Sequence, residues 1–187
     1  MMNLYHNVLF VHILSALTLF LGYGLEWTVS ALLRHSSTTD QARAWLRVYR
    51  VSPPVTGVAL ALLILSGGWL SALSGGMNNG WLIVSVLGIV VALLIGFALI
   101  LPRLRRIRAA LPEGNAPLLP EALLQLQSPV LLRLIRVRAL LAVAIVYLMT
   151  AKPPLTASLI VIAAPLVAGV LFSLAAWPRR FAKNSAA

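Results

Sequence analysis

The sequence predicts an all-α fold: a polytopic transmembrane helix bundle with five spans, an N-terminus outside and a cytoplasmic C-terminus. Three observations predict it. Of the 187 residues, 60% are hydrophobic and only 10% are charged, whereas a soluble globular chain has about 25% charged residues. Apolar runs long enough to cross a bilayer recur along the chain. Almost all basic residues fall in segments that would lie on one side of the membrane.

The composition excludes several classes of site. The chain has no cysteine, so disulfides, zinc–thiolate sites, iron–sulfur clusters and cysteine nucleophiles are excluded. The net charge is +11, which in a soluble protein would suggest nucleic acid. Here the basic residues lie between apolar spans and form no recognition motif, so we expect the lipid bilayer as partner and no nucleic acid. No Lys or Arg precedes the first apolar run, so we expect a permanent helix there and no secretory signal.

Five segments are long enough to span a membrane. A span needs about 20 apolar residues, because an α-helix rises about 1.5 Å per residue through a hydrocarbon core of about 30 Å. In a single transmembrane domain over residues 1–187, the predicted spans are 8–31, 55–73, 81–101, 131–151 and 155–177.

Prolines and cap residues set the predicted boundaries. Asp40 is placed to begin a short helix in the first loop, and Ser52 precedes two prolines, as an N-cap before a first-turn proline does. Pro102 should stop the third span, and the residues after it should form a basic continuation of the third helix. Lys152-Pro153-Pro154 should end the fourth helix, which begins at proline after Ser128, and Pro165 should kink the fifth. The segment 120–127 is expected to form one or two turns on the membrane surface.

The charges fix the orientation. Every Lys and Arg except Lys152 lies in the first loop, in the connection from the third to the fourth span counted up to Arg138 at the start of the fourth helix, or in the C-terminal tail. Since cytoplasmic loops carry the excess of Lys and Arg, these three segments are predicted to be cytoplasmic. The localisation that follows is the bacterial inner (plasma) membrane, with several passes.

One side of the first span is polar or small. On a helix, the side chains that share it are His12, Ser15, Gly22, Tyr23, Glu26 and Ser30. Polar groups in hydrocarbon must find partners, so this side should face the bundle. It either lines a pocket, or its polar groups satisfy one another between helices.

Small residues recur at helix-packing spacing on the second and third spans. They are Gly67, Ser71 and Gly75, and Ser85, Gly88, Ala92 and Gly96. Such stripes let helix backbones approach closely. We expect packing within the bundle, with a dimer interface as the alternative.

The fourth helix is short for a span. Its clean apolar part, 139–151, rises only about 20 Å, so Arg138 and Arg136 must enter the inner leaflet. Glu26 is the one acid inside a span. By helical rise it lies about 27 Å below the outer end of the first span, at Val8. Arg136 and Arg138 lie about 24 Å and about 21 Å below the outer end of the fourth helix, at Lys152, which is a similar depth. We predict a buried ion pair of Glu26 with Arg136 or Arg138. In the alternative, the arginines reach lipid phosphates and Glu26 reaches the cytoplasmic interface.

His12 is the candidate cofactor ligand. It lies about 6 Å below the outer boundary and Met149 about 4.5 Å below it, and a His/Met pair can ligate haem iron or copper. His6 and Lys152 complete a predicted outer polar rim, in which Lys152 either meets an anionic group or anchors the helix end. The sequence contains no Ser/His/Asp set, phosphate loop, acidic metal cluster or HExxH motif, so no catalytic residues are predicted.

The segments FVHILSALTLFLGYGLEW, GGWLSAL and RVRALLAVAIVYLMTAKPPLTASL resemble a bacterial family of predicted integral membrane proteins, domain-of-unknown-function family 2269, over nearly the whole chain. More distantly, the first helix is similar to copper-resistance D-type proteins and membrane protoporphyrinogen oxidases, which open with a transmembrane histidine and a glycine ten residues on, as in His12 and Gly22. Haem ligation in the oxidases implies a second histidine in a later helix. This sequence has none in its second to fifth spans.

Three functions follow as hypotheses. The first is a structural or accessory inner-membrane protein without catalysis, acting with another membrane subunit or as a homo-oligomer. The second is a haem- or copper-handling protein that uses His12, with haem b as the candidate cofactor. The third is a small transporter or channel component.

Overall fold

The structure is a computed structural model that describes residues 2–73, 78–111, 126 and 128–175. Its elements are helical, which confirms the all-α prediction. In chain order they are α1 (Met2–Arg34), α2 (Thr39–Tyr49), α3 (Ser52–Leu73), α4 (Gly80–Leu94), the π-helix η2 (Ile95–Ile100), α5 (Leu101–Ala109), α7 (Pro129–Ala151) and α8 (Leu155–Ala175). They fall into two compact units, one of Met1–Asn79 with Leu101–Ser128 and one of Gly80–Ile100 with Pro129–Ala187.

Among the described residues, three helical stretches are long and apolar enough to cross a membrane: Asn3–Arg34, Thr39–Leu73 and Gly80–Ala109. They contain the first three predicted spans. A shorter apolar helix, Leu155–Leu171, lies in the predicted fifth span. The described part of the fold is therefore all-α with three candidate spans and a shorter apolar helix. The fourth and fifth spans stay predictions.

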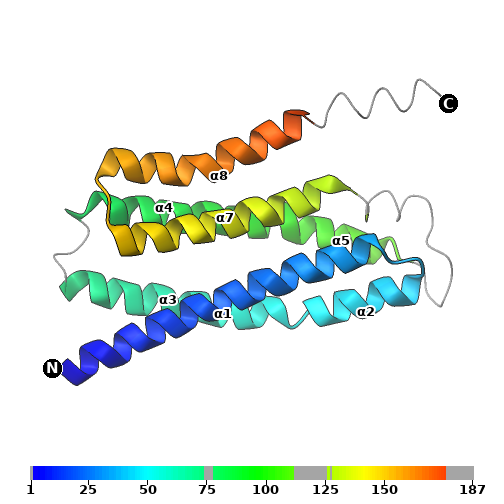
Figure 1. Cartoon of the computed structure of the whole chain (residues 1–187). Coiled ribbons are helices and arrows are strands. Elements are labelled where there is room, and N and C mark those ends of the chain that lie inside the picture. Colours follow the sequence, from blue (N-terminus) through cyan, green and yellow to red (C-terminus); the bar gives the residue numbers. More distant parts are fainter. Residues whose placement is uncertain (1, 74–77, 112–125, 127, 176–187) are drawn as a thin grey trace. The chain divides into compact units, whose positions relative to one another are not determined.

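In the first unit, α1 packs along α3, and α2 lies against the C-terminal half of α1 (Figure 1). The short helix begins at Thr39 and not at Asp40, because Thr38 caps it: the Thr38 side chain accepts a hydrogen bond from the Gln41 backbone N–H. α3 begins at Ser52, close to the predicted start.

In the second unit, α4, α7 and α8 all contact one another (Figure 1). Gly88 makes this possible, since a Cβ there would lie 2.9 Å from Ile162 Cδ1 and 3.2 Å from Ile145 Cγ1. Ser85 and Ala92 on the same side of α4 are buried. The small residues of the third span therefore pack within this unit, as expected.

Pro102 was predicted to end only the membrane-spanning part of the third helix, and the predicted basic continuation of that helix beyond Pro102 is present. The helix continues to Ala109, and Ile95–Ile100 adopts π-helical turns directly before the proline. Proline lacks the N–H that an α-helix would bond four residues back, and the π-helical turns already break that regular pattern. The chain thus passes Pro102 without ending the helix.

The boundary between α7 and α8 is as predicted. α7 ends at Ala151 and α8 begins at Leu155, with Lys152 in the left-handed region at φ 48°. Pro165 lies inside α8, and its kink stays a prediction. Gly75, the segment 120–127 apart from Leu126, and the basic tail lie outside the described residues.

Candidate functional site

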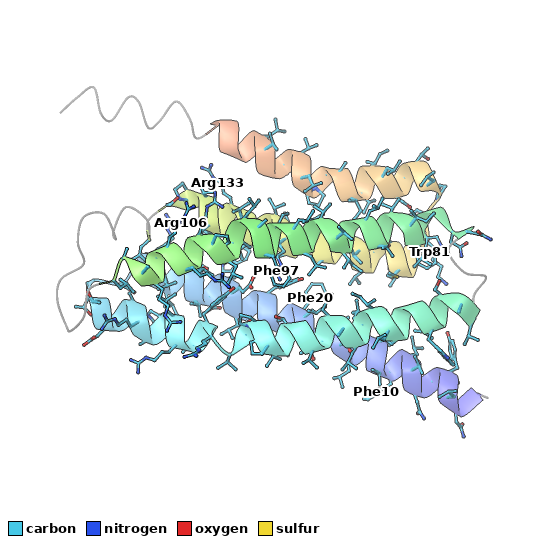
Figure 2. The ribbon with its side chains drawn as sticks, turned by 180° about the vertical axis from the view of Figure 1, so that it is seen from behind. Phe10, Phe20, Trp81, Phe97, Arg106 and Arg133 are labelled. Atoms are coloured by element: carbon cyan, nitrogen blue, oxygen red, sulfur yellow. The ribbon has the colours of Figure 1, made fainter. Side chains whose placement is uncertain are left out.

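The polar side of α1 faces the protein, as predicted. Ser15 and Glu26 are each 4% exposed and Ser30 is 3% exposed. On the opposite side Leu17 is 56% exposed, and Phe10, labelled in Figure 2, is 64% exposed. A helix with this pattern presents its apolar side to lipid and its polar side to its neighbours.

His12 bonds α3 through one ring nitrogen. Its Nδ1 lies 3.1 Å from Ser66 Oγ, and that hydroxyl donates its own proton to the Leu62 carbonyl at 2.6 Å. The proton in the contact between His12 and Ser66 must therefore come from Nδ1. In the neutral ring this leaves Nε2 as the nitrogen with a free lone pair.

Gly67 provides the space for this ring. A Cβ at Gly67 would lie 3.0 Å from His12 Cε1. The second span thus supplies both the Ser66 hydroxyl that accepts from His12 and the space that the ring occupies. At Gly67, the small-residue stripe of this span therefore packs within the first unit. These observations support the interpretation that His12 and the hydroxyls satisfy one another between helices.

Gly67→Leu is expected to displace the His12 ring and to weaken the packing of α1 on α3, because overpacking a filled contact costs about 1–3 kcal/mol. Gly68→Leu is the matched control, since nothing lies within 4 Å of a Cβ at Gly68. Thermal unfolding in detergent should show a lower midpoint for the first variant only. Equal midpoints would contradict the placement of His12.

Glu26 is buried near the C-terminal end of α1 and accepts a hydrogen bond from α2. The Tyr49 hydroxyl donates to Glu26 Oε1 at 3.1 Å. Sequence reasoning missed Tyr49, although a tyrosine in the last turn of a loop helix is a common interfacial residue. Arg136 and Arg138 belong to the other unit, so their ion pair with Glu26 stays a prediction.

A close approach of α1 and α3 lies one turn from Glu26. Gly22 is buried, and a Cβ there would clash with Thr56 Cγ2. Ser52 Oγ donates to the Gly22 carbonyl at 3.5 Å, and Thr56 Oγ1 donates to the Ser52 carbonyl at 2.9 Å. The first unit thus gathers small and polar groups of three helices around Gly22 and Glu26.

In the second unit the Arg138 guanidinium lies against the π-helix. A Cβ at Gly96 would lie 3.2 Å from both Cζ and Nη1 of Arg138. Gly96 therefore leaves the space that this guanidinium occupies. Arg136, two residues earlier on α7, is exposed.

The residues of the predicted outer rim have local contacts. Lys152 Nζ lies 5.7 Å from the centroid of the Trp81 ring, within the range of a cation–π contact, and this supports its role as an anchor of the helix end. His6 is exposed, and its ring meets the Tyr5 ring edge-on at 5.6 Å.

The predicted ligand pair stays a prediction. His12 belongs to the first unit and Met149 to the second. Among the residues that the structure describes, no group of three or more His, Cys, Asp or Glu side chains could hold a metal ion.

Comparison with known proteins gave one family. The profile described as predicted integral membrane protein (DUF2269) matches residues 6–153, a range that includes His12, Glu26 and all of α7. Neither the curated proteins nor the solved structures gave a match.

Proposed function

The chain belongs to the DUF2269 family of predicted integral membrane proteins, and from this premise we propose that it is a structural or accessory protein of the bacterial inner membrane. It crosses the membrane five times, with the N-terminus outside. It has no catalytic role of its own and acts with another membrane subunit or with a second copy of itself. The family match confirms the resemblance found in the sequence.

One observation carries this proposal. The two ionisable side chains in the first span, His12 and Glu26, each bond a side chain from another helix of the same unit, Ser66 and Tyr49. Polar groups used in this way hold helices together within a membrane. The packing roles of His12 and Glu26 favour a structural protein over an enzyme.

The charges support the orientation. In the second unit, Arg133 lies near the start of α7, at the end away from Trp81 (Figure 2). Lys152, the residue directly after α7, lies beside Trp81. The three arginines of α7 therefore share its first half, which the positive-inside rule puts toward the cytoplasm.

The experiment is purification in mild detergent with two different affinity tags, followed by a visible spectrum, metal analysis and a subunit count. The proposal expects a colourless, metal-free protein that retains one partner, or a second copy, at constant ratio through both tags. Substrate uptake by vesicles that contain the protein alone would favour a transporter instead and would contradict the proposal.

A second candidate function is haem or copper handling through His12. The observation that favours it is the orientation of the ring: Nδ1 bonds Ser66, so Nε2 keeps the lone pair that a metal requires. Under this candidate the purified protein shows a Soret band or bound copper. His12→Ala should then remove the signal, while the control variants His6→Ala and His35→Ala should keep it.

A further inference from the structure

Five arginines of the first unit are exposed and lack a partner among the described residues. They are Arg47 and Arg50 at the end of α2, and Arg105, Arg106 and Arg108 on α5. None of their side chains makes an ion pair or hydrogen bond with another residue that the structure describes. We call these five residues the basic surface. Such a concentration of like charge requires counter-ions.

The two helices that carry the basic surface are joined. Arg43 on α2 donates from Nη2 to the carbonyl of Leu111, just after α5, at 3.4 Å. The helices run in opposite directions (Figure 1). Arg47 lies one turn after Arg43, and Arg108 lies one turn before Leu111. Because the helices are antiparallel, both residues lie about 5–6 Å from the Arg43–Leu111 hydrogen bond in the same direction along the helix axes. Arg47 and Arg108 therefore lie at a similar height along the two helices.

The helix α5 presents Arg105, Arg106 and Arg108 away from the protein. Leu104 and Ile107 are 5% and 3% exposed and share its inner side. Arg105 and Arg106 lie on either flank of the outer side, and Arg106 projects from the helix in Figure 2. The buried leucine and isoleucine hold α5 in place, so the position of its arginines is fixed by packing.

The depth of these helices matches the lipid headgroups. α3 has 22 residues, which rise about 33 Å and fill the hydrocarbon core. Arg50 and Arg47 come just before it. The stretch Gly80–Ala109 has 30 residues, of which about 20 fill the core, so its last turns, which carry Arg105, Arg106 and Arg108, emerge at the headgroup layer. Headgroup phosphates lie at this level.

We propose that the basic surface binds the phosphodiester headgroups of anionic phospholipids in the cytoplasmic leaflet. Guanidinium groups bond phosphate oxygens in pairs, with a planar fork that matches phosphate geometry. Basic residues near an anionic membrane surface are attracted to it electrostatically. The surface fixes the depth of the first unit through lipid contacts. This inference rests on membrane insertion and not on the accessory role proposed above.

The test uses the full chain in lipid nanodiscs made with phosphatidylcholine alone or with one third phosphatidylglycerol. Thermal unfolding should shift upward in the anionic discs, and lipids retained in native mass spectrometry should be enriched in phosphatidylglycerol. The triple variant Arg105→Gln, Arg106→Gln, Arg108→Gln should lose most of the shift and the enrichment. Inorganic phosphate added to the neutral discs should give no comparable shift, since a free phosphate ion is not the proposed ligand.

Two further variants keep the test decisive. Arg47→Gln with Arg50→Gln should lose part of the shift and serves if the triple variant fails to fold. The matched control Arg179→Gln, Arg180→Gln, Lys183→Gln removes three positive charges from the tail and should keep the shift. Equal shifts in the wild-type protein and in both basic-surface variants would overturn the proposal, as would an equal loss in the tail control. Failure to co-purify a partner would affect only the accessory role.

Discussion

Gly22→Leu is expected to destabilise the first unit more than any other single exchange on α1. A side chain at this position meets Thr56 Cγ2. Thr56 cannot rotate away freely, because its hydroxyl donates to the Ser52 and Pro53 carbonyls at 2.9 and 3.2 Å. The leucine must therefore push α1 away from α3, at a cost of about 1–3 kcal/mol or more.

Gly24→Leu is the control for this variant. Gly24 is exposed, and nothing lies within 4 Å of a Cβ there. Both variants gain the same intrinsic helix propensity, about 1 kcal/mol, so the difference between them isolates the contact with Thr56. Thermal unfolding in detergent should show a lowered midpoint for Gly22→Leu and an unchanged or raised midpoint for Gly24→Leu. A similar response of the two variants would refute the close approach of α1 and α3.

The second large effect is expected at Glu26. Tyr49→Phe removes the hydroxyl that donates to this buried carboxylate, and a buried acceptor that loses a donor costs about 1–3 kcal/mol. Glu26→Gln should also lower stability, and the double variant should lose less than the sum of the two. The control is Tyr147→Phe, because Tyr147 is 51% exposed. Additive losses would show that the hydrogen bond contributes nothing.

The same comparison of two single variants with their double variant, a double-mutant cycle, tests the predicted ion pair. Arg136→Gln and Arg138→Gln are each combined with Glu26→Gln, and a coupling energy well above that of an exposed pair, about 1 kcal/mol, is expected for one of the two arginines. Zero coupling energy between Glu26 and both arginines would contradict the predicted ion pair. Tyr49 would then be the partner of Glu26.

The sequence predicted those features that depend on local pattern. The length of the apolar runs identified α1 and α3, and the prolines after Lys152 set the end of α7 at Ala151. Helical periodicity alone placed Ser15, Glu26 and Ser30 on one buried side. These features follow from helix geometry and from the exclusion of polar groups from hydrocarbon.

Other features depend on contacts between distant segments, which no local pattern encodes. The bond from Tyr49 to Glu26 requires α2 to fold back along α1, and the space at Gly67 exists because His12 lies opposite. The helix through Pro102 depends on the π-helical turns before it, and single-residue rules for proline do not anticipate such turns. No local pattern predicts the hydrogen bond from Arg43 to the Leu111 carbonyl.

The central claim is that the chain crosses the membrane five times with its N-terminus outside. Single cysteines in the cysteine-free chain, treated with a membrane-impermeant maleimide on intact spheroplasts, test it directly. In the five-span topology, Asn3→Cys, Asn78→Cys and Ala151→Cys lie outside and should be labelled. Ser37→Cys, Ala109→Cys and Ser185→Cys lie in the cytoplasm and should be protected. Labelling of Ser185→Cys from outside, or protection of Asn3→Cys, would contradict it.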